Sequence, residues 1–97
     1  MRSEWIEYNG KKILYQDFSQ LFYNSAAVKA ELAEVQEIVK AQPKDSVLVL
    51  TDIRDTNVDA ELLPAMNAAS AATKAYVKKT AVIGVTGVKQ KLADLLT

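Results

Sequence analysis

The sequence predicts a single α/β domain over residues 1–97, built as a four-stranded mixed sheet with packed helices. Three observations support this fold class. The dipeptide Asn9-Gly10 separates two alternating apolar segments, which is the strongest short-range signal for an antiparallel hairpin. Two longer segments carry apolar residues at helical spacing, and each is followed by a short apolar run. The predicted order of elements is β-β-α-β-α-β-α, with a parallel core beside the hairpin.

We expect the hairpin strands at residues 4–8 and 12–17, which alternate and contain aromatic and β-branched residues. Their aromatic residues Trp5 and Tyr15 are expected in core or edge packing, with an aromatic ligand wall or a dimer contact as alternatives. Residues 18–24 are apolar without periodicity and are expected to form a packed loop. The side chains expected to pack it are Phe18, Leu21 and Phe22.

Residues 25–41 form the first predicted helix, because apolar residues recur there at spacings of three and four. The repeating positions are Val28, Leu32, Val35 and Val39. Pro43 ends this helix, since proline disfavours helical geometry in the residue before it. Residues 46–51 follow as a strand whose two faces are both apolar, which is typical of the centre of a parallel sheet.

The second helix is predicted from about Asp59 to Tyr76. Its inner stripe consists of Leu62, Met66, Ala69, Thr73 and Val77. Its many alanines favour helix and permit close packing on the sheet, while Pro64 predicts a kink or a late helix start. Residues 78–85 form the last predicted strand.

A final helix is expected to open at Thr86-Gly87. Its apolar edge consists of Val88, Leu92, Leu95 and Leu96. If both long helices lie on one face of the sheet, the opposite face needs another cover. Residues 18–24, the final helix or a second subunit could supply it, so a homodimer stays an open alternative.

The composition excludes several classes of function. Twelve basic and twelve acidic residues give a net charge of zero, which leaves no bulk positive field to hold nucleic acid. Cysteine and histidine are both absent, which excludes Ser–His–Asp and Cys–His catalysis and removes the commonest zinc ligands. We therefore expect no enzyme, no metal and no cofactor. No segment approaches the roughly 20 apolar residues of a membrane span and no signal peptide is visible, so we expect a cytoplasmic protein.

The order of elements, the VLVLTD strand with its acidic loop, and the closing stretch AVIGVTGVKQKL resemble small bacterial STAS-like proteins. These belong to the sulfate transporter and anti-sigma factor antagonist superfamily. The resemblance covers nearly the whole chain and implies a non-catalytic regulatory or ligand-binding module. Better-characterised relatives carry a phosphorylatable serine in an Asp-Ser-Ser-Gly-type loop. Here Asp55 matches the acidic residue and Thr56 can stand in for the serine, whereas Asn57 and Val58 depart from the motif.

Ligands of open α/β sheets bind outside the carboxyl ends of the parallel strands. The candidate site residues at these ends are Ser19, Asp52, Arg54, Asp55, Thr56, Thr86, Gly87 and Lys89. The simpler interpretation of the acidic loop is that an aspartate or Asn57 caps the helix and that Arg54 pairs with an aspartate. The loop lacks the spacing and glycine of an EF-hand, so a metal site is not expected.

The stretch that begins at Thr86 places free amides and two lysines at a helix start, which could favour an anion, but a capped and solvated helix start is the preferred interpretation. Three hypotheses of function follow from the sequence. The leading one is a non-catalytic module that binds a partner protein or small ligand at the carboxyl edge. The second is a carrier of a lipid or other apolar molecule, suggested by the two-faced strands and residues 18–23. The third is a phospho-regulated antagonist that uses Thr56.

Overall fold

The computed structural model describes residues 2–84 and 95–96 and confirms the predicted α/β fold with a four-stranded mixed sheet. The elements are β1 (Glu4–Tyr8), β2 (Lys11–Asp17), α1 (Ser25–Lys40), β3 (Val47–Asp52), α2 (Leu62–Thr73) and β4 (Val77–Ile83). The predicted final helix lies mostly outside the described residues, although Leu95 and Leu96 are helical. No helix in the described part of the chain is long and apolar enough to cross a bilayer.

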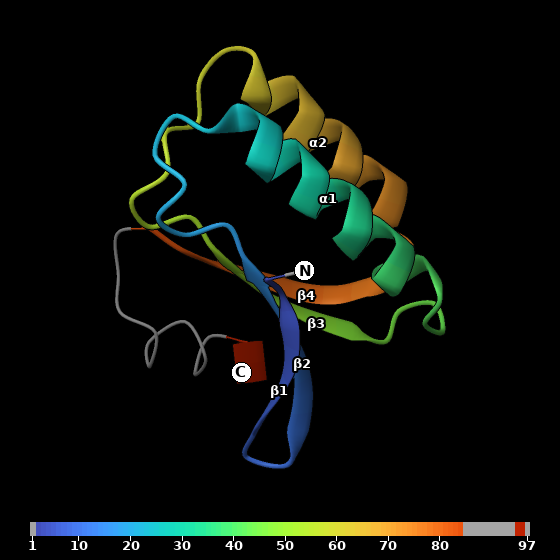
Figure 1. Ribbon diagram of the computed structural model, residues 1–97. Coiled ribbons are helices and arrows are strands. Elements are labelled where there is room, and N and C mark those ends of the chain that lie inside the picture. Colours follow the sequence, from blue (N-terminus) through green and yellow to red (C-terminus); the bar gives the residue numbers. More distant parts are fainter. Residues whose placement is uncertain (1, 85–94, 97) are drawn as a thin grey trace.

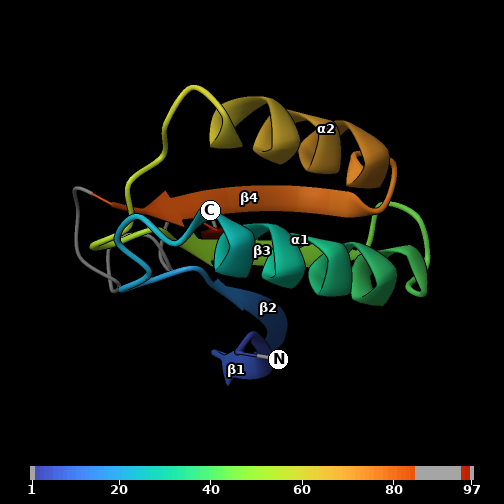
Figure 2. The same ribbon diagram turned by 45° about the horizontal axis from the view of Figure 1, so that its top comes forward.

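The sheet has the strand order β1-β2-β3-β4, in which only the first pair is antiparallel. Asn9 and Gly10 have φ values of 51° and 77°, which confirms the left-handed geometry predicted for the hairpin turn. Both helices cover the same face of the sheet, with α2 beside β4 at its edge (Figure 1 and Figure 2). The helix layer and the strand layer therefore enclose one core, and the other face of the sheet holds a second.

The helix-facing core contains buried side chains from both layers: Leu14, Phe18, Val28, Val35, Val39, Val49 and Leu62. On the opposite face, Ile13, Leu50 and Ile83 pack against Leu95, which is also buried. This arrangement confirms that β3 is apolar on both faces. Leu95 thus contributes to the cover of the face opposite α1 and α2.

The loop between β2 and α1 packs differently from the prediction. Phe18 is buried and Leu21 is partly buried, whereas Phe22 is 60% exposed, so the expected packing role of Phe22 is wrong. Phe22 has a positive φ of 49°, and this backbone geometry accompanies its outward placement. Asn24 then caps α1, because its side-chain oxygen accepts a hydrogen bond from the amide of Ala27 at 3.1 Å.

The start of α2 follows the capping interpretation of the acidic loop. The carboxylate of Asp59 accepts hydrogen bonds from the amides of Glu61 at 3.1 Å and Leu62 at 2.8 Å. The helix begins at Leu62, so Pro64 lies in its first turn, where a missing amide proton leaves no helical hydrogen bond unmade. Of the two alternatives predicted from Pro64, a kink or a late helix start, the structure shows the late start. The helix ends at Thr73, earlier than predicted.

Candidate functional site

The carboxyl ends of the three parallel strands meet at one edge of the sheet, as predicted. Asp17 of β2 is the register partner of Asp52 of β3, which in turn pairs with Ile83 of β4. Beyond the strands, the amide of Phe18 donates to the Asp52 carbonyl at 2.9 Å, and the amide of Ile53 donates to the Ile83 carbonyl at 2.9 Å. The loops that follow these strands are therefore held together by their backbones.

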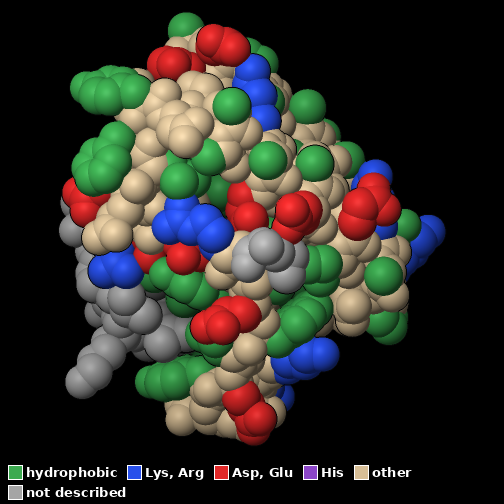
Figure 3. Space-filling view, in the orientation of Figure 1, with side chains coloured by type: hydrophobic (Ala, Val, Ile, Leu, Met, Phe, Trp, Pro, Cys, Tyr) green, Lys and Arg blue, Asp and Glu red, His purple; other side chains and the backbone are tan. Residues whose placement is uncertain are grey.

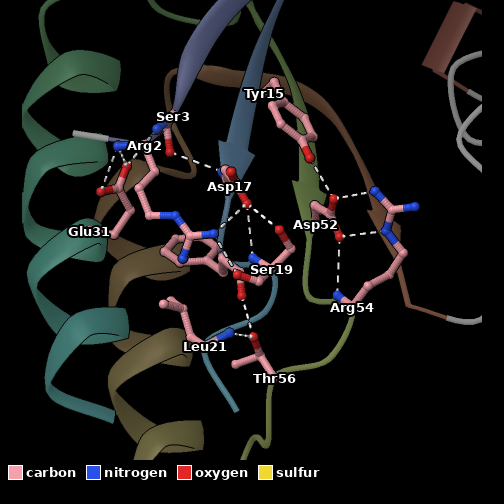
Figure 4. Close-up of polar contacts among 11 residues, drawn as sticks. Arg2, Ser3, Tyr15, Asp17, Ser19, Leu21, Glu31, Asp52, Arg54 and Thr56 are labelled. Atoms are coloured by element: carbon pink, nitrogen blue, oxygen red, sulfur yellow. Dashed lines mark hydrogen bonds and ion pairs between the residues drawn. The ribbon is translucent and has the colours of Figure 1, made fainter. Parts of the chain in front are cut away.

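Asp52, whose side chain is buried, forms an ion pair with Arg54 at this edge (Figure 4). Its side chain is inaccessible to solvent, whereas that of Arg54 is 49% exposed. Arg54 donates from Nε at 3.0 Å and from Nη2 at 2.7 Å to the two carboxylate oxygens, and its backbone amide adds a third bond. The hydroxyl of Tyr15 donates a fourth. This geometry confirms the simpler interpretation, in which Arg54 pairs with an aspartate.

Tyr15 is a member of this cluster that the sequence did not assign to the site. The register of β2 against β3 places Tyr15 opposite Leu50, two pairs away from Asp17–Asp52, on the face of the sheet opposite α1 and α2. The period-two alternation of the two strands shows that Tyr15 and Asp52 share a face, but only once the register of the strands is known. The predicted role of Tyr15 in packing was correct but incomplete.

The charges of this cluster are fixed near neutral pH. Burial alone would raise the pKa of the Asp52 carboxyl, but hydrogen bonds from Arg54 and Tyr15 outweigh burial and hold that pKa below its ordinary value. Burial, followed by the hydrogen bond to Asp52 and its charge, raises the pKa of Tyr15 to about 12. A general acid or base works best with a pKa near the working pH. Neither side chain meets that requirement.

Thr56 uses its hydroxyl to join the two loops at this edge. The hydroxyl donates to the carbonyl of Phe18 and accepts from the amide of Leu21 at 3.0 Å. Backbone bonds extend the contact, since the amide of Phe22 donates to the Asp55 carbonyl at 2.9 Å and the amide of Asn57 donates to the Phe22 carbonyl at 2.7 Å. Both hydrogen-bonding functions of the Thr56 hydroxyl are therefore occupied.

The joined loops present two aromatic side chains to solvent. Phe22 is 60% exposed and Tyr23 is 83% exposed. They border a shallow hollow of about 470 Å³ whose other walls include Arg54, Asp55 and Asn57. Hydrophobic side chains protrude over the loops that precede α1 and α2 (Figure 3). We call this region the aromatic corner.

Ser19 belongs to a separate polar cluster near the N-terminus. Its hydroxyl donates to Asp17 at 2.6 Å, and Arg2 contacts both the Ser19 carbonyl and the Asp17 carboxylate. The buried carboxylate of Glu31 accepts from the amides of Arg2 and Ser3 and so fixes the N-terminal segment on α1. No side-chain hydrogen bond between described residues links this cluster to Asp52. The remaining predicted site residues, Thr86, Gly87 and Lys89, lie outside the described residues.

We expect the buried carboxylates of Glu31 and Asp52 to make the free energy of unfolding decrease at acidic pH. Burial would raise the pKa of Glu31, but hydrogen bonds from Ser3 and Arg2 lower it below 4.5, and the pKa of Asp52 lies below 3.8. A carboxyl whose pKa falls on folding stabilises the protein above its unfolded pKa, and this contribution disappears as the pH falls through the folded value. Urea unfolding should therefore show stability falling steeply below about pH 4.5. Asp52→Asn should reduce the slope, and an unchanged slope would contradict the assignment to Asp52.

A cleft of about 490 Å³ lies between the helices and the sheet. One face of α2 forms its roof and the helix-facing side of β3 and β4 forms its floor. Representative lining residues are Met66, Ser70, Lys74, Val49, Thr80 and Val82. Two of the exposed large apolar side chains, Leu63 at 51% and Val82 at 42%, line it. Ligand-binding cavities in proteins have volumes of this size.

The cleft shows that the close packing expected of the alanine-rich helix does not occur along β4. Of the residues of α2, only Leu62 and Ala69 are buried, and both belong to the cluster shared with α1. Small side chains on α2 leave the space above Thr80 and Val82 unfilled. The sequence contained one signal of this cleft: Thr51 and Thr80 occupy helix-facing strand positions where a filled core would favour apolar side chains.

Comparison with known proteins adds no assignment: no family model, curated protein or solved structure matches this chain. The resemblance to STAS-like proteins therefore stays a prediction, and function is inferred from the geometry.

Proposed function

We propose that this protein is a non-catalytic binding module whose ligand is a small molecule with a largely apolar body, held in the cleft between α2 and the sheet. The observation that supports the proposal is the cleft itself, a space of about 490 Å³ in a 97-residue chain. The cleft is open to solvent and carries the exposed apolar side chains of Leu63 and Val82. An apolar ligand held there would remove this apolar surface from water, which is favourable.

The lining supports the choice of ligand. Val49, Met66 and Val82 supply apolar surface on the floor and roof, and Thr51 and Ser70 supply a few polar groups that could orient a ligand. Cavities for small molecules combine these two elements. The proposal develops the apolar-carrier hypothesis, although the cleft extends beneath α2 instead of beneath residues 18–23.

The carboxyl edge supports binding over catalysis. The strongest polar groups at this edge already have hydrogen-bond partners within the protein. Asp52 bonds to Arg54 and Tyr15, and Thr56 bonds to the backbone of the neighbouring loop. The pKa of Asp52 is lowered and that of Tyr15 is raised, so neither is suited to proton transfer near neutral pH. A cytoplasmic location, a site without cofactor, STAS-like membership and phospho-regulation at Thr56 stay predictions.

Filling the cleft is expected to remove ligand binding. In the variant Ser70→Phe a large side chain replaces a small one on the roof, and we expect it to weaken binding of decanol at least about tenfold. Decanol should bind about three- to fourfold more tightly than nonanol, because each buried methylene contributes about 0.8 kcal/mol. Isothermal titration calorimetry below the solubility limit of each alcohol measures both effects.

The matched control is Ala71→Phe, which adds the same side chain at the next position of α2, an exposed residue outside the cleft. We expect this variant to bind decanol like the wild type. Equal binding by the wild type and Ser70→Phe, or no saturable binding at all, would contradict the proposed function.

The aromatic corner is a second candidate site, for a partner protein. The exposure of Phe22 and Tyr23 favours it, because aromatic residues are enriched at the centre of protein interfaces. This candidate site lies at the carboxyl edge of the parallel strands, where the sequence predicted a site, and Arg54 and Asp55 line it. Binding that Tyr23→Ala removes and Ser70→Phe leaves intact would assign the function to this corner.

A further inference from the structure

The cleft is electrostatically one-sided. Among the described residues that line it, Lys74 is the single charged side chain, and no carboxylate is present. The ion pairs of the described residues join other groups, and none of them involves Lys74. A cation at the border of a cleft without a compensating acid favours an anionic or electron-rich group on the ligand.

The position of Lys74 defines an end of the cleft. It follows directly after the last residue of α2, whereas Leu63 lies in the first turn of the same helix. Their separation of eleven sequence positions corresponds to about 16 Å along the helix axis. At the Leu63 end the lining includes the apolar side chains of Ile53 and Val58, together with Asn67 one helical turn further along α2. The cleft therefore runs from a mainly apolar end to a cationic end.

We propose that the cleft binds an amphipathic anion, with its single anionic head group beside Lys74 and its apolar chain extending along α2 toward Leu63. This inference rests on the proposed function and specifies the chemical class of its ligand. The floor of the cleft also carries a polar pair, in which the hydroxyl of Thr51 donates a hydrogen bond to the side chain of Gln16 at 3.2 Å. A ligand with both polar and apolar parts is compatible with this lining.

A lysine after a helix also stabilises the helix dipole, and this role needs no ligand. Lys40 allows the two roles to be separated. It is the last residue of α1, is exposed, and does not line the cleft. Replacing either lysine with glutamine removes the same charge from the end of a helix, but only Lys74→Gln changes the cleft.

The test compares three probes that share one chain: decanoate, decanol and decyltrimethylammonium. The two ions are titrated below their micelle concentrations, and decanol is titrated below its solubility limit. We expect decanoate to bind about three- to fivefold more tightly than decanol, the size of effect that a partly exposed ion pair provides. The cation should bind most weakly. Lys74→Gln should remove the preference for decanoate, and Lys40→Gln should retain it.

The two proposals fail in different ways. If decanol binds as tightly as decanoate, or if Lys74→Gln keeps the preference for the anion, the anionic class is wrong while the apolar cleft stands. If Ser70→Phe leaves binding of all three probes unchanged, or if no probe binds saturably, the cleft is not the site and both proposals are wrong.

Discussion

Asp52→Ala is expected to lower the free energy of unfolding by about 2–3 kcal/mol, the largest effect of any single change at the carboxyl edge. The carboxylate is fully buried and accepts hydrogen bonds from Tyr15 and from both the side chain and the amide of Arg54. Alanine leaves these donors without their acceptor. The loss stays below that of a fully buried ion pair, because Arg54 is half exposed and can be hydrated.

Urea unfolding followed by circular dichroism measures this loss. Asp52→Asn keeps the shape of the side chain and an acceptor for Tyr15, so we expect it to lose roughly half as much. The control is Glu37→Ala, which removes an exposed carboxylate of α1 and should change stability by less than about 0.5 kcal/mol. If Asp52→Ala were as stable as that control, the ion pair would not hold the edge together.

Thr56→Val is expected to lower the free energy of unfolding by about 2 kcal/mol, because it keeps the shape of the residue and removes the hydroxyl. The amide of Leu21 and the carbonyl of Phe18 would then lose their partner in a partly buried contact. Amide hydrogen exchange gives a local readout. The Leu21 amide should exchange much faster in the variant, while amides in the centre of β3 should change only with global stability.

Two further variants make this prediction specific. Thr56→Ser retains the hydroxyl and should restore most of the stability. Thr73→Val makes the same substitution where the hydroxyl bonds only to its own helix, at the Ala69 carbonyl, and should have little effect. Equal losses in Thr56→Val and Thr73→Val would show that the contact between the two loops contributes nothing.

This contact also bears on the phosphorylation hypothesis. A phosphate on Thr56 would remove the proton that the hydroxyl donates to Phe18 and would add charge where Leu21 now donates to a neutral oxygen. The loops would have to separate before a kinase could reach the hydroxyl. The geometry therefore favours the structural role that the departures at Asn57 and Val58 already indicated.

Local signals were sufficient to predict the elements of the fold. Asn9-Gly10 predicted the hairpin because its left-handed geometry is local, and the helical spacing from Val28 to Val39 predicted α1 within one residue of its end. The bounds of α2 were less accurate. The side chain of Asp59 accepts hydrogen bonds from the amides of Glu61 and Leu62, but the helix itself begins only at Leu62. Capping and first-turn geometry depend on details that periodicity does not contain.

The site was predicted less completely, because its parts depend on contacts between distant residues. The carboxyl edge followed from strand order, and the pairing of Arg54 with an aspartate is a local contact. The contact of Tyr15 with Asp52 depends on the register of β2 and β3. The cleft depends on how far α2 lies from β4, which the alanines of the helix leave undetermined. Tertiary packing therefore decided what the sequence pattern left open.

The most direct test of the central proposal is a titration of the protein with decanoate, followed residue by residue in amide NMR spectra. We expect saturable shifts that are largest for residues of the cleft, such as Val49, Met66 and Val82, and that disappear in Ser70→Phe. Shifts that are largest at Phe22 and Tyr23, or spectra that do not respond to decanoate, would contradict the assignment of the cleft as the binding site.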